Sequence, residues 1–262
     1  MPKLKNAPVF LTAAQVTHNP VLALESFLPN LQERFRALGF PDYQLRQQQR
    51  FALSSELGDE LQVKVDVSKQ YAFSNFERTA CFIVEPARIF FCVTNYDVFT
   101  VFRQQFIDGL ELVHSVIKLD YFENVSMRML DAIVPDSRNL GFFLVPELLG
   151  LPNRIAEPSW SVLHSGQESA FRSKSHQLKA RTFIHNGRLA LPPDIQMIKL
   201  ALLPKFNGVD AVHAVLDSDA TLQCREPFDV QKIGNSLLGL KNDLKLLFDI
   251  SVTDAAKEEW NK

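Results

Sequence analysis

The chain is poor in glycine, which accounts for 10 of its 262 residues. That share is about half of the ~7% that is usual in proteins. A shortage of glycine argues against collagen-like repeats, glycine-rich linkers and most loops that cradle phosphate groups. Gly234 and Gly239 have a Walker-like spacing, but Lys241 comes one place too late and no magnesium-binding hydroxyl follows it. The sequence therefore gives no sign of a nucleotide-binding loop.

The common signatures of catalysis and metal binding are also missing. The chain has no G-x-G-x-x-G, H-E-x-x-H, C-x-x-C or G-x-S-x-G motif. Its six histidines never fall at ligand spacing on one expected element. We therefore expect no catalytic residues, no cofactor and no metal site, and the sequence leans toward a role other than that of an enzyme.

Charge of one sign and long apolar runs are missing as well. With 28 Lys and Arg against 30 Asp and Glu, the net charge is −2. The overall charge thus suggests neither nucleic acid nor a membrane surface as a partner, although a local patch stays open. No stretch approaches the ~18 consecutive apolar residues of a membrane span, and no signal peptide is recognised. We expect a soluble, cytoplasmic protein with no membrane partner.

Cysteine is scarce and odd in number. Cys81, Cys92 and Cys224 lie in or beside apolar runs. This pattern favours reduced, buried thiols in the cytoplasm over a disulfide framework.

What the chain does have is a hydrophobic share of 46%, arranged in strand and helix patterns. The order of the elements predicts an α+β fold in two halves, residues 1–150 and 151–262, each an antiparallel sheet with helices packed on one face. The first half has the strand-helix-strands-helix-strand order of a split-βαβ (ferredoxin-like) sandwich. Glu85-Pro86-Ala87 predicts a hairpin, and Asp229 is expected to cap a long final helix.

Phenylalanine is concentrated in the first half, which holds 16 of the 21. Because its ring provides a large apolar area without a hydroxyl to satisfy, the heavier core is expected there. The second half is then the better place to look for a binding surface.

The strongest candidate for such a surface is the segment Ser169–Pro193, which contains no Asp or Glu. In strand register, alternate residues from 179 to 185 share one face. Cations bind phosphates and rings stack on bases, so this face suits single-stranded nucleic acid or a phosphorylated ligand. The solvated face of a half-buried sheet, or a docking surface for an acidic partner, has the same composition. The candidate anion- or nucleic-acid-binding residues are Arg172, Lys174, Lys179, Arg181, Phe183 and His185.

Two pairs of charged residues interrupt otherwise apolar segments. Arg128 and Asp131 are three positions apart, so they point to opposite faces of a regular strand; we interpret them as a candidate for structural ion pairing. Asp217 and Asp219 would share a face of an extended segment and could then chelate a cation. A polar turn at 217–219 explains the same residues, and we favour it.

Short segments in a characteristic order cover nearly the whole chain: Lys5–Val9, Phe27–Leu31, Met127–Pro135, Val145–Gly150, Leu191–Asp194 and Phe248–Asp254. Together they resemble the K-x-A-P-[IV] N-terminus, the P-E-L-x-G middle and the S-V-T-D tail of a sporadically distributed prokaryotic family of uncharacterised proteins. Lys241 stands where members of that family commonly have His. The resemblance implies an α+β architecture and brings no established activity. The patchy distribution of the family resembles that of genes on mobile or defence-related islands.

These observations lead to three functional hypotheses. We expect a non-enzymatic interaction or regulatory protein in a bacterial defence or toxin-control locus, with another protein as its partner. The alternative is a protein that binds single-stranded RNA or DNA through the basic sheet of residues 169–193. A second alternative is a metal-dependent hydrolase that uses Asp217 and Asp219. Unpaired edge strands would also allow a homodimer.

Overall fold

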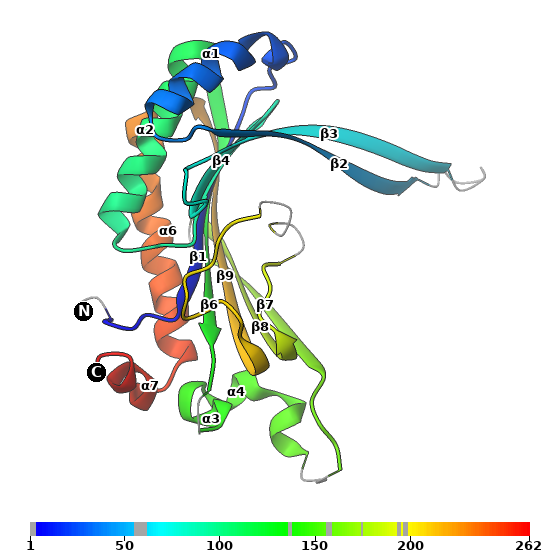
Figure 1. Ribbon diagram of the computed structural model, residues 1–262, viewed down its shortest axis with the longest axis vertical. Helices are drawn as coiled ribbons and strands as arrows, with labels where there is room; N and C mark the ends of the chain where they lie inside the picture. Colours follow the sequence, from blue (N-terminus) through cyan, green and yellow to red (C-terminus); the bar gives the residue numbers. More distant parts are fainter. Residues whose placement is uncertain are drawn as a thin grey trace.

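The computed structural model describes part of the chain, namely residues 4–54, 62–135, 138–155, 159–173, 175–192, 195 and 199–262. Within these residues the fold is α+β: nine antiparallel strands form one sheet, with helices against it (Figure 1). The strands are β1 (Val9–His18), β2 (Asp42–Ser54), β3 (Gln62–Ser74), β4 (Ala80–Glu85), β5 (Arg88–Val93), β6 (Tyr121–Ile133), β7 (His164–Arg172), β8 (His176–Arg188) and β9 (Asp210–Pro227). The helices are α1 (Leu24–Ala37), α2 (Phe99–Ile117), α3 (Leu140–Phe143), α4 (Pro146–Leu149), the 3₁₀ turn η1 (Leu151–Arg154), α6 (Val230–Ser251) and α7 (Asp254–Glu259).

The sheet is continuous across the two expected halves. Its strand order is β2-β3-β4-β5-β1-β6-β9-β8-β7, so the strands of the first half form one block and those of the second half the other. The blocks join where β6 pairs with β9 along nearly its whole length. One sheet therefore replaces the two that the sequence suggested, because this pairing leaves neither block with a free edge at the junction.

Strand β9 corrects a second expectation. It runs from Asp210 to Pro227 without interruption, so the polar turn expected at 217–219 is wrong. Asp217 pairs with Leu130 of β6 on one side and with Arg181 of β8 on the other. Backbone hydrogen bonds from two neighbouring strands override the turn preference of the local Asp-Ser-Asp sequence.

One face of the sheet is covered by α1, α2 and α6, which lie together on the left in Figure 1. Phenylalanine rings of the first half stack between these helices and the sheet, with centroids 4.3 Å apart for both Phe35–Phe73 and Phe82–Phe91. Two of the few glycines allow this close packing. A Cβ atom on Gly109 of α2 would lie 2.2 Å from the Phe82 ring, and one on Gly234 of α6 would lie 2.6 Å from Ile107. A side chain at either position would force its neighbour to move: the Phe82 ring at Gly109, and the more flexible tip of Ile107 at Gly234.

Local signals in the sequence predicted several element boundaries correctly. Glu85 pairs with Arg88 across a tight β4–β5 turn, which confirms the predicted hairpin. The Asp229 side chain accepts a hydrogen bond of 2.9 Å from the backbone N–H of Lys232, which confirms the predicted cap of α6. None of the described helices is long and apolar enough to cross a membrane.

The opposite face of the sheet is covered in part by the chain between β8 and β9. Its Leu189 and Phe206 are buried in a second apolar cluster with Phe10 of β1. Lys205 Nζ of this segment donates a hydrogen bond of 2.6 Å to the Ala7 carbonyl, just before β1. Another part of this face carries polar side chains around a hollow, among them Gln15, Ser126 and Asp219. We call this part of the face the groove.

The three cysteines are free, as predicted. Cys81 and Cys92 belong to the second apolar cluster and are fully buried, whereas Cys224 is half-buried. Burial raises the pKa of the Cys81 thiol to about 11 and that of Cys92 well above its usual value.

Candidate binding groove on the open sheet face

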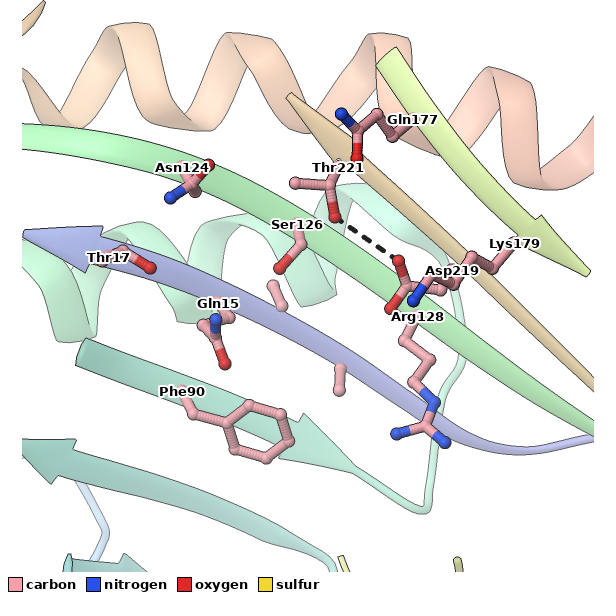
Figure 2. Close-up of a pocket in the computed structure, with 12 residues that line it drawn as sticks. Gln15, Thr17, Phe90, Asn124, Ser126, Arg128, Gln177, Lys179, Asp219 and Thr221 are labelled. Atoms are coloured by element: carbon pink, nitrogen blue, oxygen red, sulfur yellow. Dashed lines mark hydrogen bonds between the residues drawn. The ribbon is translucent and has the colours of Figure 1, made fainter. Parts of the chain in front are cut away.

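The groove is formed by residues of four adjacent strands, β1, β6, β9 and β8, together with Phe90 of the neighbouring β5. Successive side chains of a strand point to opposite faces, so the positions between the buried apolar residues meet on this side. They enclose a hollow of about 360 Å³. Figure 2 shows them on the side of the sheet away from the helices. The polar residues that line it are Gln15, Thr17, Asn124, Ser126, Arg128, Gln177, Lys179, Asp219 and Thr221.

The register of the strands arranges charges of opposite sign side by side. Asp219 of β9 stands between Arg128 of β6 and Lys179 of β8 in one row of cross-strand neighbours. In the next row, Arg181 of β8 stands between Asp217 of β9 and Glu168 of β7. Opposite charges on directly paired positions stabilise a sheet.

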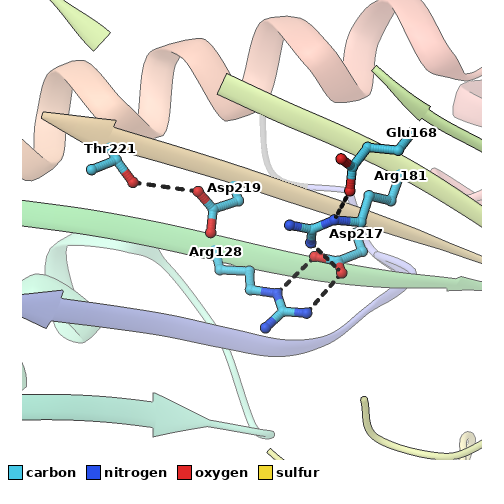
Figure 3. Close-up of polar contacts among 6 residues, drawn as sticks. All are labelled: Arg128, Glu168, Arg181, Asp217, Asp219 and Thr221. Atoms are coloured by element: carbon cyan, nitrogen blue, oxygen red, sulfur yellow. Dashed lines mark hydrogen bonds and ion pairs between the residues drawn. The ribbon is translucent and has the colours of Figure 1, made fainter. Parts of the chain in front are cut away.

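Asp217 is the centre of this network, and its side chain is only 1% exposed. Arg128 donates to both of its carboxylate oxygens, from Nε and Nη2, at 2.7 Å each (Figure 3). Arg181 Nη1 donates a third hydrogen bond of 2.8 Å, while its Nε donates to Glu168 at 2.7 Å. Charge-assisted hydrogen bonds of this kind hold both guanidinium groups in place and neutralise much of their charge.

Asp219 lies beside this network and is less firmly held. It accepts a hydrogen bond of 3.4 Å from the Thr221 hydroxyl. Burial raises the pKa of its carboxyl, an effect that the charges of Arg128 and Arg181 oppose. Asp219 therefore keeps an oxygen facing the hollow that a donor on a partner molecule can reach.

A larger hollow of about 760 Å³ continues the groove toward the chain between β8 and β9. Arg128 and Asp219 line both hollows. One wall of the larger hollow is formed by three cross-strand neighbours, His164, His185 and His213. Their ring centroids are 6.2 Å apart for the first two and 5.9 Å apart for the last two. Among the residues that the structure describes, no group of three or more His, Cys, Asp or Glu side chains could hold a metal ion.

The structure places most of the basic candidates on the groove. Lys179, Arg181, Phe183 and His185 lie on one face of β8, and Arg172 is paired with Gln177 on the same face. Lys174 lies outside the described residues. Arg128 and Asp131 lie on opposite faces of β6, as expected: Arg128 points into the groove and forms an ion pair with Asp217, whereas Asp131 points to the helical side and forms no ion pair with the described residues.

Sequence reasoning did not connect this basic face with the carboxylates that balance it. Glu168 lies just before the acid-free segment, and Asp217 and Asp219 lie about 25 residues beyond it. The signal that could have found them is the alternation of Asp217, Asp219 and Thr221 with buried residues along β9, which is typical of a strand with one polar face.

The fold and the groove together define an α+β protein with a broad, polar and charge-balanced surface on the open face of its sheet. No protein-family model matches the chain, and no curated protein matches it.

Proposed function

We propose that this protein is a non-enzymatic interaction or regulatory protein and that its groove binds a polypeptide segment of a partner. The observation that supports this best is the charge balance of the groove, where Asp217 already neutralises Arg128 and Arg181. A phosphate backbone needs free cations, since its affinity comes from charge neutralisation and counterion release. Protein interfaces instead combine polar groups with paired charges of both signs.

The remaining polar side chains of the groove suit a polypeptide. Gln15, Asn124 and Gln177 carry amides that can both donate and accept hydrogen bonds. Such groups match the backbone N–H and C=O groups of an extended segment. Recognition by these amides would be set by shape and hydrogen bonding more than by net charge.

We place this activity in the cytoplasm, in a bacterial defence or toxin-control locus. The free cysteines support a reducing compartment. The assignment to such a locus rests on the resemblance to a sporadically distributed family. Identifying the partner protein tests this assignment.

Site-specific photo-crosslinking in the native host tests the proposal directly. A photoreactive amino acid replaces Ser126 in the groove or, as the control, Leu246, which is exposed on α6. We expect a defined covalent adduct with one protein from position 126 and none from position 246. Adducts of the same pattern from both positions, or none from position 126, would contradict the proposal.

Binding of single-stranded nucleic acid is the second candidate function. Arg172 and Lys179 are exposed on the groove face of their strands, and Phe183 offers a ring for stacking. This function predicts binding of single-stranded RNA or DNA that weakens with salt and in Lys179→Glu, but not in Arg36→Glu on α1. A flat titration at low salt excludes it and leaves the polypeptide partner.

Metal-dependent hydrolysis has less support. Both oxygens of Asp217 accept hydrogen bonds from arginines, which compete with a cation for the same lone pairs. Metal analysis of the purified protein tests this alternative.

We also propose that residues 1–150 and 151–262 are two structural units, the first with split-βαβ (ferredoxin-like) topology. In support, the strands of that unit that flank α1 and α2 follow the order β4-β5-β1-β6, as in a split-βαβ sandwich. The hairpin β2–β3 is then an insertion that extends the sheet (Figure 1).

A homodimer is a further proposal. The ends of the sheet are β2 and β7, and β7 carries exposed side chains over most of its length. An unprotected edge strand can pair with a second copy of itself. Light scattering of the purified protein distinguishes a dimer from a monomer.

A further inference from the structure

A separate cavity of about 300 Å³ lies on the helical side of the sheet, away from the groove. Its walls come from β1, β6 and β9, from the chain just before α2, and from α6. Most of the wall is apolar, including Met129, Leu244 and Phe248. Cavities of this size and character hold small organic ligands.

Asp131 of β6 is the most unusual group in this wall. Its residue is 6% exposed, and none of the described residues donates a hydrogen bond to its carboxylate. Burial raises the pKa of this carboxyl to about 7. A buried polar group without a partner is costly, and its persistence calls for an explanation such as a ligand.

Three further polar groups line the same cavity: the hydroxyls of Tyr96 and Ser218 and the ammonium group of Lys241. In the part of the chain that the structure describes, none of the three has a hydrogen bond or an ion pair. Ser218 is the cross-strand neighbour of Met129, two residues from Asp131 on β6. One acceptor, two hydroxyls and one cation that lack partners within the described residues form the donor and acceptor pattern of a binding site.

The other charged groups of the wall are already engaged. Lys245 forms an ion pair with Asp249 on the same helix. Asp97 takes part in another interaction of its own. Among the residues that the structure describes, the cavity thus presents one negative group without a partner, Asp131, and one positive group without a partner, Lys241.

We propose that this cavity is a binding site for a small zwitterion with an apolar body, of the chemical class of the apolar α-amino acids. The protonated amine of the ligand bonds to Asp131, and its carboxylate bonds to Lys241. The apolar side chain packs on Met129, Leu244 and Phe248. A simple amine fits less well because it leaves Lys241 unpaired, and a simple acid leaves Asp131 unpaired.

Titration calorimetry of the full chain tests this site with defined probes. The probes are L-leucine, L-methionine and L-phenylalanine, together with 2-phenylethylamine, which lacks the carboxylate, and 3-phenylpropionate, which lacks the amine. The titrations are made above the pKa of Asp131, which is about 7. We expect at least one amino acid to bind. For phenylalanine, each of the two truncated probes should bind at least ~10-fold more weakly.

Two variants assign the binding to the named residues. Asp131→Asn keeps the shape of the side chain, and Lys241→Met keeps its length, so each removes one charge. Each variant should bind the amino acid ~10-fold or more weakly than the parent protein does. Lys232→Met, on the same helix as Lys241 but outside the cavity, should leave the affinity for the amino acid unchanged.

The proposal is overturned if no amino acid binds the folded protein at ~10 mM, an affinity below which a site has little meaning. It is equally overturned if 2-phenylethylamine binds as tightly as phenylalanine, or if neither Asp131→Asn nor Lys241→Met changes the affinity. Because this cavity and the groove lie on opposite faces of the sheet, these outcomes do not bear on the polypeptide partner.

Discussion

Arg128 of β6 donates two hydrogen bonds of 2.7 Å to the carboxylate of Asp217 on β9. The two strands come from different halves of the chain and pair with each other within the sheet, between β1 and β8. This salt bridge therefore links the two halves of the sheet, and the side chain of its acid, Asp217, is only 1% exposed. Its removal should affect the stability of the whole sheet.

Asp217→Asn keeps the shape of the side chain and removes the negative charge to which Arg128 and Arg181 donate. Breaking a buried ion pair by removing one partner costs about 3–5 kcal/mol, and we expect a loss of this order in the free energy of unfolding. Urea denaturation measures it. The control is Asp210→Asn, whose ion pair with Arg188 is exposed and should contribute less than ~1 kcal/mol. Equal losses in the two variants would show that Asp217 has no special role.

The close contact of α2 with β4 predicts a cost for the smallest possible substitution. In Gly109→Ala, the new methyl group would lie 2.2 Å from the buried Phe82 ring, so the helix or the ring must move. Overpacking of this kind costs about 1–3 kcal/mol. Gly239→Ala on α6 is the matched control, since its nearest neighbour is the edge of His176 at 3.1 Å. In thermal melts, the melting temperature of Gly109→Ala should be well below that of Gly239→Ala. The reverse order would refute this account of the packing.

The cavity at Asp131 predicts a specific dependence of stability on pH. The carboxyl has a pKa near 3.8 when the chain is unfolded, and burial raises it to about 7 in the folded protein. The folded state therefore binds this proton more tightly than the unfolded state does. Well below pH 3.8 the carboxyl is protonated in both states and its ionisation does not affect stability. The free energy of unfolding then falls progressively as the pH rises from 3.8 toward 7. The full penalty is at most about 4 kcal/mol.

Asp131→Asn removes that penalty, so it should be more stable than the parent protein above pH 7 and nearly equal to it near pH 4. Denaturation of both proteins at several pH values measures the difference. A difference that stays constant with pH would mean that Asp131 does not titrate as its burial requires.

The cysteines should differ in reactivity. Burial raises the pKa of Cys81 to about 11 and keeps Cys92 protonated as well, whereas Cys224 is only half-buried. We expect a thiol reagent at pH 8 to modify Cys224 first and all three thiols once denaturant is added, because the thiolate is the reactive form. Peptide mapping identifies the modified residue. Rapid modification of Cys81 in the folded protein would contradict its position in the second apolar cluster.

Local features were predictable from the sequence because they depend on neighbouring residues. The Asp229 cap, the β4–β5 hairpin and the common face of Lys179 and Arg181 all follow from periodicity and from short-range hydrogen bonding. The strand through Asp217 was misjudged for a related reason. The local turn preference of Asp and Ser is real, but pairing with two neighbouring strands outweighs it.

The amino-acid sequence by itself determined the α+β class, the phenylalanine-rich core and the absence of acids between residues 169 and 193. Only the tertiary structure decided the character of the basic face, because Glu168 and Asp217 reach Arg181 from the strands on either side of β8. It likewise decided that Asp131 would face a cavity on the helical side, with no hydrogen-bond partner among the described residues. The physical reason is that cross-strand neighbours are set by strand order and register, which depend on contacts between residues far apart in the chain.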